Sequence, residues 1–530
     1  MRARPRVAAA ALAGLALLVP RPSPAQSTTR AITLAEAIVL ALAKNERIIV
    51  ERESVEAAEA AITAAKGAYD PVFELRADWQ RAAPPVNSAF SGAPEGELAP
   101  TLNSAGAGAS LGTLLGSGGA VSLRTSATRT TTDGGFDLLS PAYWTGLGVE
   151  FRQPLLRGRS VDAARLALRV TSAERTRAGA SLRRELNDTV AAVELAYWRL
   201  AAVRRSVAVG EEAVRLAEEQ LAETAERIAS GTAPEKEIAQ PRAELERRRG
   251  DLISARETLA RAGNALKLLI LDDSDTETWA AQLEAVDPVE TRVVTADAAS
   301  AMERALASRA EIEAAGAALA RRESESAFAR DGLRPSLDVV LSYDRYGLAG
   351  SVNPAGATIP GLPAAVPPGL TGGWSHSYGV LGDGDFDDAR AALVLGIPLG
   401  NRAASGAHAG AVAAERQARL ELAAARKAIR AEVLDAVAGL DTAGQRIEAA
   451  RAAREAAEVQ LEAERERYAA GLSTNFLVLT RQNDLSSARL DEIAALTNYR
   501  MSYAALARAT GSLLEERGIS TPPEPAGGAS

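Results

Sequence analysis

The chain contains an internal duplication, and this feature limits its possible folds more than any other. The segment AEEQL at residues 217–221 recurs as AEVQL at residues 457–461, 240 residues later. ERIASG at residues 226–231 recurs at the same offset as ERYAAG at residues 466–471. The sequence therefore predicts two structural repeats.

Prolines keep the same register between the two repeats. Pro71 corresponds to Pro335 at an offset of 264 residues, and Pro154 corresponds to Pro398 at an offset of 244. Chance similarity between Ala-rich helices would not keep glycine and proline in step as well. Because 264 − 244 = 20, the first repeat carries about 20 extra residues between Pro71 and Pro154.

Four segments beside these prolines alternate between apolar and polar or small residues, as β-strands do. Pro71 and Pro335 precede strands and Pro154 and Pro398 follow them, where a missing amide hydrogen costs a sheet least. We interpret these prolines as β/α hinges. A soluble sandwich would alternate too, so the pattern alone does not separate a protein core from lipid. The apolar faces are Phe73, Leu75, Ala77 and Trp79; Leu147, Val149 and Phe151; Leu337, Val339, Leu341 and Tyr343; and Ala391, Leu393, Leu395 and Ile397.

Each repeat also contains a very long helical pattern. From about residue 161 to 230 there is no proline, and thirteen steps of an apolar stripe cover residues 182–228. The mean step of about 3.5 residues predicts one continuous helix packed along its length. At 1.5 Å per residue such a helix is about 105 Å long. The pattern recurs at residues 411–470.

A returning helix is expected after each long helix, with the hairpin tips near Gly231 and Gly471. In the first repeat, Thr232-Ala-Pro-Glu235 matches a capping box with proline in the first turn. In the second repeat the returning helix is expected at residues 475–514.

Two Gly-, Ser- and Thr-rich stretches, residues 82–141 and 347–387, are expected to be long loops. Residues 109–115 and 120–130, around Gly116-Ser-Gly-Gly119, could form the additional hairpin that the offsets require. We expect this hairpin to extend from an external loop. Each chain then has four strands, too few to close a barrel, and three chains give twelve strands around a lumen. The alternative is that the hairpin joins the barrel wall, in which case three chains would supply eighteen strands.

Composition excludes several classes of function. The chain has no cysteine and two histidines, so disulfides, thiol nucleophiles and Cys/His zinc sites are not expected. Its 60 basic and 68 acidic residues are interspersed, which gives no basic surface for nucleic acid. No nucleophile, metal cluster or phosphate loop stands out. We expect no enzyme activity, no cofactor and no metal.

The N-terminal residues 1–25 have the pattern of a signal peptide, with three arginines, an apolar stretch at residues 7–19 and small residues before Gln26. No later stretch is apolar for long enough to form a membrane-spanning helix. The predicted domains are a signal peptide (1–25), repeat 1 (26–270), an inter-repeat linker (271–297), repeat 2 (298–515) and a disordered C-terminal tail (516–530).

Four segments together resemble the TolC-like outer-membrane efflux protein family. The resemblance rests on the order, spacing and duplication of TLAEAIVLALAKN (33–45), QPLLRG (153–158), IPLGNR (397–402) and RYAAGLS (467–473). It implies an α+β fold in which an outer-membrane β-barrel continues as a long α-helical barrel, or tunnel. It also implies a trimer, with each chain built from two structural repeats.

The resemblance further implies a passive exit duct of a tripartite efflux or type I secretion system of a Gram-negative cell. The implied location is the outer membrane, with the tunnel in the periplasm. The implied partners are outer-membrane lipid, two further copies of the chain, a periplasmic adaptor (membrane fusion) protein and an inner-membrane pump of the RND, ABC or MFS type.

The tips are candidate docking sites for the adaptor, and a solvated helix end is the alternative interpretation. The residues concerned are Arg227, Gly231 and Thr232 in the first repeat and Arg467, Gly471 and Ser473 in the second.

The resemblance also directs attention to a gate. Family members often carry acidic residues just past the second tip, but this chain has Leu477 and Thr480 at those positions. The first-repeat counterpart of Leu477, at the offset of 240, is Glu237. Glu237 is therefore the candidate gate residue, and an ordinary solvated glutamate is the alternative.

The sequence is also compatible with an alternative class of protein, the periplasmic adaptor. Periplasmic adaptors also contain long helical hairpins without forming a channel. That alternative predicts one hairpin flanked by small soluble β domains, whereas this sequence predicts two hairpins, each joined to strands.

Overall fold

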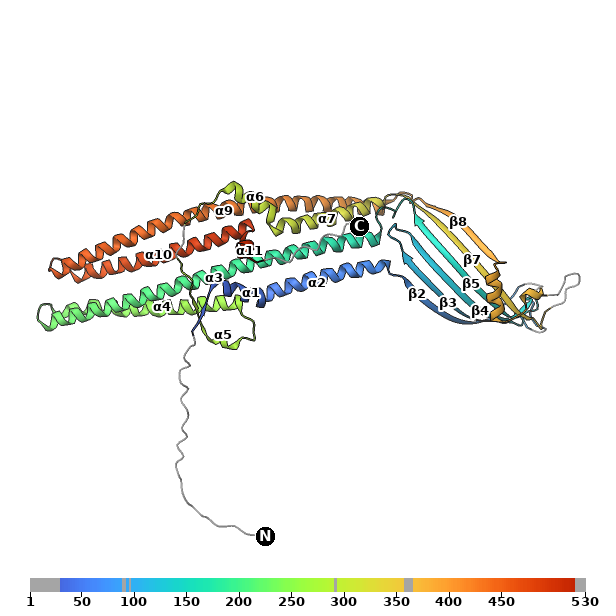
Figure 1. Ribbon diagram of the computed structural model, residues 1–530, viewed down its shortest axis with the longest axis horizontal. Coiled ribbons are helices and arrows are strands. Elements are labelled where there is room, and N and C mark those ends of the chain that lie inside the picture. The colour runs from blue at the N-terminus through green and yellow to red at the C-terminus, as the bar shows by residue number, and fades with distance from the viewer. Residues whose placement is uncertain (1–28, 88–91, 95–96, 290–292, 357–365, 520–530) are drawn as a thin grey trace, which may run out of the picture. The chain divides into compact units, whose positions relative to one another are not determined.

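A computed structural model describes residues 29–87, 92–94, 97–289, 293–356 and 366–519 (Figure 1). The predicted signal peptide and residues 520–530 of the predicted tail lie outside the described residues. The chain forms two compact units. The tip unit comprises the chain up to Asn45, Thr189–Val294 and Leu440–Ala504, and the sheet unit comprises Glu46–Asp188, Thr295–Gly439 and the chain from Ala505 onward.

The sheet unit is built on one antiparallel sheet of six strands (Figure 1). Our expectation of four strands, with the extra hairpin in an external loop, is wrong. β3 and β4 pair with each other over thirteen residues and join β2 to β5 within the sheet. In order across the sheet, the strands are β2 (Val72–Ala82), β3 (Leu102–Leu114), β4 (Ala120–Thr132), β5 (Leu139–Pro154), β7 (Ser336–Val352) and β8 (Asp387–Gly396).

The composition of β3 and β4 explains why their alternation is weak in the sequence. One face of β3 carries Ala105, Ala107 and Ala109, and the other carries glycine and serine. The two faces of β3 therefore differ little in hydropathy. These strands are defined by their pairing with neighbours rather than by their own pattern.

Four helices attach to the same end of the sheet (Figure 1). Pro71 directly precedes β2, Pro335 directly precedes β7, Pro154 ends β5, and Pro398 follows β8 by two residues. Their role as hinges stays a prediction. The attached helices are α2 (Glu46–Lys66), α3 (Ala163–Ala229), α7 (Ala310–Asp331) and α9 (Arg402–Ala469).

The second expected loop also contains regular structure. β7 continues to Val352, and α8 (Trp374–Asp383) follows the short helix η3 (Pro368–Leu370). The hydroxyl groups of Ser377 and Thr145 lie 2.9 Å apart where α8 contacts the sheet. A Cβ atom on Gly347 would lie 2.0 Å from the Ser377 carbonyl oxygen, so glycine permits this close approach.

α8 lies where β8 no longer pairs with β7. The β7–β8 ladder ends at the pair Arg345 and Asp387. Beyond it, the Gly350 carbonyl oxygen accepts a hydrogen bond of 2.9 Å from the Gly372 amide. The far part of β7 is therefore covered by the η3–α8 segment instead of a strand.

The tip unit contains two antiparallel helical hairpins and a small parallel sheet. The long helices α3 and α9 have 67 and 68 residues; α3 agrees closely with the predicted range 161–230, whereas α9 begins nine residues before the predicted start at residue 411. None of the helices in the described ranges combines the length and apolarity that crossing a membrane requires. The returning helices are α4 (Ala239–Ile270), preceded by the short helix η2 (Glu235–Ile238), and α10 (Asn475–Thr510), whose last residues belong to the sheet unit.

The remaining elements are short. β1 pairs in parallel with β6, which lies in the predicted inter-repeat linker. α1 and α6, each of 11 residues, open the two repeats with N-caps at Thr33 and Asp297. The bounds are β1 (Thr29–Ile32), α1 (Leu34–Lys44), η1 (Gly67–Tyr69), α5 (Thr276–Ala280), β6 (Gln282–Ala285), α6 (Ala298–Ser308) and α11 (Leu513–Glu516).

A buried tyrosine connects the linker to the core of the tip unit. Tyr197 of α3 is fully buried, and its hydroxyl contacts the Asp287 carboxylate and accepts hydrogen bonds from the Val286 and Asp287 amides. Burial and the bond to Asp287 raise the pKa of Tyr197, so the phenol stays protonated and can donate.

One ion pair in the sheet depends on a glycine. Arg124 of β4 and Asp344 of β7 lie in the same row across the sheet, with Gly148 of β5 between them. The Arg124 guanidinium donates to both Asp344 oxygens at 2.7 and 2.8 Å. A Cβ atom on Gly148 would lie 1.9 Å from Asp344 Oδ1, so the pair crosses β5 only because residue 148 has no side chain.

We predict that Gly148→Ala destabilises the sheet by about 1–3 kcal/mol, because the methyl group displaces the ion pair. Gly112→Ala is the matched control, since its Cβ would make only ordinary contacts at 3.8 Å on the same face. Thermal unfolding of the purified protein in detergent, followed by β-sheet circular dichroism, measures the difference. Equal unfolding temperatures for the two variants would contradict the proposed role of Gly148.

Candidate functional site

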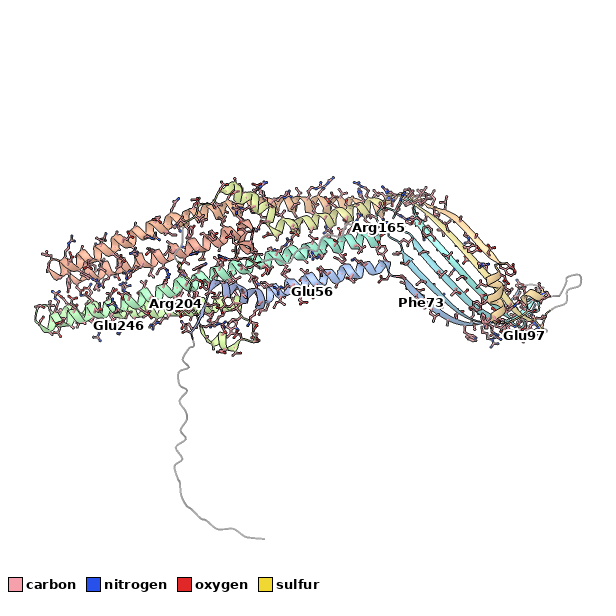
Figure 2. All side chains as sticks on the ribbon, in the orientation of Figure 1. Glu56, Phe73, Glu97, Arg165, Arg204 and Glu246 are labelled. Carbon is pink, nitrogen blue, oxygen red and sulfur yellow. The ribbon has the colours of Figure 1, made fainter. Side chains whose placement is uncertain are left out.

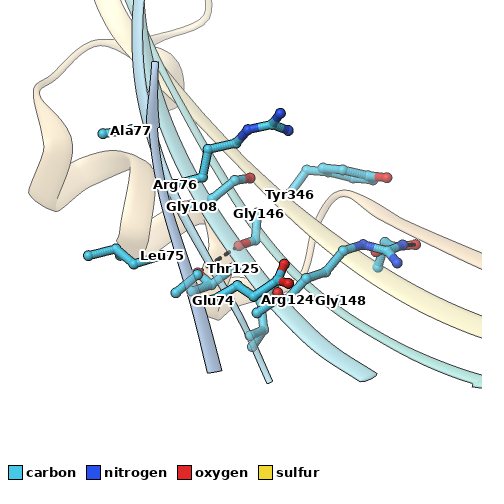
Figure 3. Close-up of a pocket in the computed structure, with 15 residues that line it drawn as sticks. Glu74, Leu75, Arg76, Ala77, Gly108, Arg124, Thr125, Gly146, Gly148 and Tyr346 are labelled. Atoms are coloured by element: carbon cyan, nitrogen blue, oxygen red, sulfur yellow. Dashed lines mark hydrogen bonds and ion pairs between the residues drawn. The ribbon is translucent and has the colours of Figure 1, made fainter. Parts of the chain in front are cut away.

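A broad groove of about 880 Å³ lies on one face of the six-stranded sheet (Figure 3). Arg76, Arg124 and Tyr346 project to this side, whereas Leu75 and Ala77 project to the other (Figure 3). The floor of the groove is largely backbone because Gly108, Gly146 and Gly148 line it. We call the face with the groove the polar face and the opposite face the apolar face.

The polar face carries charges of both signs along its strands. Arg124 pairs with Asp344 and, at 3.4 Å, with Glu150, and Arg152 pairs with Asp338. Interspersed charges suit contact with water and give no strong field of one sign. The charged residues that the strand register places on this face are Glu74, Arg76, Asp78, Arg124, Glu150, Arg152, Asp338, Asp344, Asp388 and Arg390.

The apolar face has a band without charge next to the helices. The side chains that point to this face are found by counting along each strand from its last residue next to the helices. They are the ones one, three, five and seven positions away from that residue. None of these residues, all of which the structure describes, is Asp, Glu, Lys or Arg. Phe73, which Figure 2 labels, and Leu75 and Trp79 are 66–75% exposed.

The height of this uncharged band matches a membrane. The first charged residues on the apolar face lie nine positions from the helix-proximal strand ends. Nine residues rise about 30 Å along a strand, or about 23 Å along the axis of a barrel whose strands tilt by about 40°. Outer-membrane barrels present an apolar band about 25 Å tall. The apolar face is therefore suited to lipid.

The sheet ends in two edge strands. β2 pairs only with β3, and β8 pairs only with β7. Among the described residues, each edge strand has one row of backbone amides and carbonyls without a strand partner. In lipid, such groups are costly unless another strand pairs with them.

The two hairpin tips have the same backbone geometry. Gly231 and Gly471 both have a φ of 72°. In each case the glycine amide donates to the carbonyl three residues back, and the next amide donates to the carbonyl five residues back. This is the Schellman motif, in which hydrogen bonds satisfy the free carbonyls at the end of a helix and which favours glycine at the residue with positive φ.

Thr232 does not act as the predicted N-cap. Its hydroxyl donates to the Arg227 carbonyl oxygen at 2.9 Å and so completes the end of α3. The next helical turn, η2, begins after Pro234 without any side-chain cap. The capping-box prediction is wrong because the Schellman turn places Thr232 beside the free carbonyls of α3.

The two tips contact each other through an arginine and a tyrosine. The Arg227 guanidinium lies over the Tyr468 ring, 4.8 Å from its centre. Burial raises the pKa of Tyr468, against the opposing effect of Arg227. Tyr468 also packs on a small apolar core between α9 and α10 that includes Leu461 and Val478.

A buried glutamate joins the other two residues predicted at the second tip. Glu464 is only 7% exposed. Its carboxylate accepts a hydrogen bond from Ser473 and pairs with Arg467 at 3.6 Å. Sequence reasoning missed Glu464, because it does not depart from the ordinary composition of a helix end. Tyr468 belongs to the RYAAGLS segment, but its contact with Arg227 was not predicted.

The candidate gate residue, Glu237, is exposed on η2, and its amide donates to the Pro234 carbonyl. Leu477, at the corresponding position of the second repeat, is 38% exposed in the first turn of α10. Thr480 donates its hydroxyl to the Phe476 carbonyl. In the described ranges, no group of three or more histidine, aspartate or glutamate residues is placed to hold a metal ion.

Comparisons with known proteins agree with this geometry. Residues 301–512 match the family model for the outer membrane efflux protein. No curated protein matches the chain. Among solved structures, the CmeC outer membrane channel of Campylobacter jejuni has a TM-score of 0.61 at 16% identity, covering 91% of this chain and 86% of that one.

Two further solved structures are similar. The outer membrane protein VceC of Vibrio cholerae has a TM-score of 0.61 at 16% identity, with coverage of 90% and 96%. The open state of the MtrE outer membrane channel of Neisseria gonorrhoeae has a TM-score of 0.57 at 18% identity, with coverage of 92% and 91%. At these identities the structures show a shared fold. The predicted resemblance is confirmed for residues 301–512, which match the outer membrane efflux protein family.

Proposed function

We propose that three copies of this chain close their sheets into one outer-membrane barrel and act as a passive exit duct for cargo from an inner-membrane pump. One observation carries the proposal. The sheet has an apolar face with an uncharged band of membrane height, a charged polar face, and two edges that pair with no further strand among the described residues. The efflux family match supports the same function.

Strand arithmetic supports closure between copies. A barrel needs about eight strands, and one chain supplies six. Three copies of six strands give eighteen, and barrels of 16–18 strands enclose an aqueous channel. The choice of three copies rests on the family resemblance. In this arrangement the polar face lines the channel and the apolar face contacts lipid.

The long helices supply the proposed tunnel. Helices of 67 and 68 residues are each about 100 Å long at 1.5 Å per residue. Two such helices and their returning partners from each of three copies supply a wall of helices. The alternative of a periplasmic adaptor is not supported, because the chain has two hairpins, a six-stranded sheet and a match to the efflux family.

The tips are the proposed contact with a periplasmic adaptor. Their exposed apolar residues, Leu472 at 81% and Phe476 at 60%, support a docking role. The Schellman turns fix the direction in which the tips present Arg227, Thr232, Arg467 and Ser473. An RND, ABC or MFS pump would then deliver the cargo through the adaptor.

We predict that the detergent-solubilised protein from the outer membrane is a trimer, with three times the mass of the chain that remains after the predicted signal peptide (1–25) is removed. Closing the sheets of several copies into one barrel pairs the free strand edges. The family resemblance implies that the number of copies is three. Light scattering with detergent correction measures the mass. A stable monomer in the soluble fraction would contradict the duct.

We predict that Gly471→Val lowers export about tenfold while trimer assembly persists. A branched side chain at a φ of 72° costs about 1–2 kcal/mol and tilts the tip away from its docking geometry. Gly439→Val is the matched control, because Gly439 also has no neighbour near its Cβ position but lies within α9. Cellular efflux and trimer yield are the measurements. Equal export from both variants would remove the tip from the mechanism.

We predict that Glu237→Gln weakens block of the pore by multivalent cations added from the tip side. If three copies of Glu237 converge there, their mutual repulsion favours a bound cation. Glu235→Gln is the control, since Glu235 is also exposed and lies two residues away on η2. Planar-bilayer conductance compares the variants. The same block in wild type and Glu237→Gln would identify Glu237 as an ordinary solvated residue.

A further inference from the structure

The apolar face changes character at one height above the helices. The first residues of β2, β4 and β7 are Val72, Ala120 and Ser336. Arg81, Arg129 and Arg345 each follow the first residue of their strand by nine positions (81 − 72, 129 − 120 and 345 − 336). Counted from the helix-proximal strand ends, three strands therefore carry an arginine at the same position, directly beyond the uncharged band. We call these residues the arginine belt.

The strand register places the arginine belt on the apolar face. Trp79, Ala105 and Arg129 lie in one row across β2, β3 and β4. Arg81 follows Trp79 by two residues and so points to the same side. Tyr143 of β5 continues the row, and its ring lies 4.9 Å from the ring of Trp374 in α8. Aromatic and cationic side chains thus meet at the upper limit of the uncharged band.

Two members of the belt have no acidic partner. Arg81 and Arg129 are exposed, and neither forms an ion pair with any residue that the structure describes. Arg345 differs, because its guanidinium donates to the Gly382 carbonyl at the end of α8. The one carboxylate that the strands place at this height on the apolar face is Asp387, opposite Arg345 on β8. The arginines of the polar face, by contrast, include Arg124, which pairs with Asp344.

The spacing of Arg81 and Arg129 suits a phosphorylated head group. They lie on β2 and β4, with β3 between them, so their strands are about 9.6 Å apart. In the strand register, Asn103 of β3 lies level with Arg81 and Ala105 lies level with Arg129, so β3 places only short side chains between the two arginines. Guanidinium groups bind phosphate through paired hydrogen bonds, and aromatic residues at the same level favour a membrane interface.

We propose that Arg81 and Arg129 bind the phosphate groups of a phosphorylated glycolipid in the outer leaflet of the membrane. This inference rests on the proposed barrel, in which the belt lies about 23 Å from the helix-proximal strand ends. Uncompensated positive charge at this level complements anionic head groups. Arg129 lies on an inner strand, away from the sheet edges where a second copy would pair.

The test titrates diphosphoryl lipid A into the purified full-length protein in detergent and counts bound lipid by native mass spectrometry. Each arginine near a lipid phosphate contributes enough to change affinity about fivefold. We expect Arg129→Gln to weaken binding about fivefold and Arg81→Gln/Arg129→Gln about thirtyfold. Dephosphorylated lipid A should bind wild type as weakly as diphosphoryl lipid A binds the double variant.

Arg76→Gln is the matched control. Arg76 lies on β2 and is exposed, but it points to the polar face. It should leave lipid binding unchanged. Equal lipid binding by wild type and the double variant overturns the inference. So does equal loss of binding in Arg76→Gln and Arg129→Gln, which would indicate a general charge effect.

A separate measurement keeps this inference distinct from the proposed duct. Pore conductance in bilayers of phosphatidylcholine alone needs no phosphorylated glycolipid. If the wild type forms no pore, the duct proposal fails. If all variants conduct equally and the double variant still binds lipid A like the wild type, only the lipid site fails. Loss of trimer from Arg81→Gln without any change in lipid binding would assign Arg81 to the contact between copies and overturn its role here.

Discussion

In the proposed barrel, the need to pair every backbone hydrogen-bonding group of a sheet that faces lipid governs this molecule. The six-stranded sheet meets that need through strand pairing except on the outer sides of β2 and β8 and on the outer side of β7 beyond Arg345. Its apolar face cannot be buried within the sheet itself, and its polar face requires water. A single chain is therefore incomplete as a membrane structure. Joining edges between copies satisfies the backbone, the apolar face and the polar face together.

Much of the helical part could be predicted from the sequence. The expected helix at residues 161–230 is α3 (Ala163–Ala229), because an apolar stripe with a step near 3.5 residues and no proline leaves little alternative. The start of α9 was missed by nine residues, since residues 402–410 are mostly alanine and glycine and show no stripe. Both tips were located correctly because glycine is the residue that a Schellman turn favours.

The sheet and its polar groups were harder to predict. β3 and β4 are rich in alanine, glycine, serine and threonine, so hydropathy hardly alternates along them. The Arg124–Asp344 pair joins residues 220 positions apart, and only the register shows that Gly148 lies between them. The same limit applies to Arg227 and Tyr468, whose contact depends on how two hairpins pack. Local patterns do not contain such information.

The η3–α8 segment has a consequence for the chain before it reaches the membrane. β8 has only ten residues, and α8 covers the part of β7 that extends beyond it. Without this cover, the seven residues of β7 beyond Arg345 would add a second exposed template for strand addition. A newly exported chain therefore offers only a short edge on that side to other unfolded chains. The bonds from the Gly372 amide to the Gly350 carbonyl and from the Tyr346 amide to the Phe386 carbonyl occupy part of this edge, which leaves fewer backbone groups for another strand to pair with.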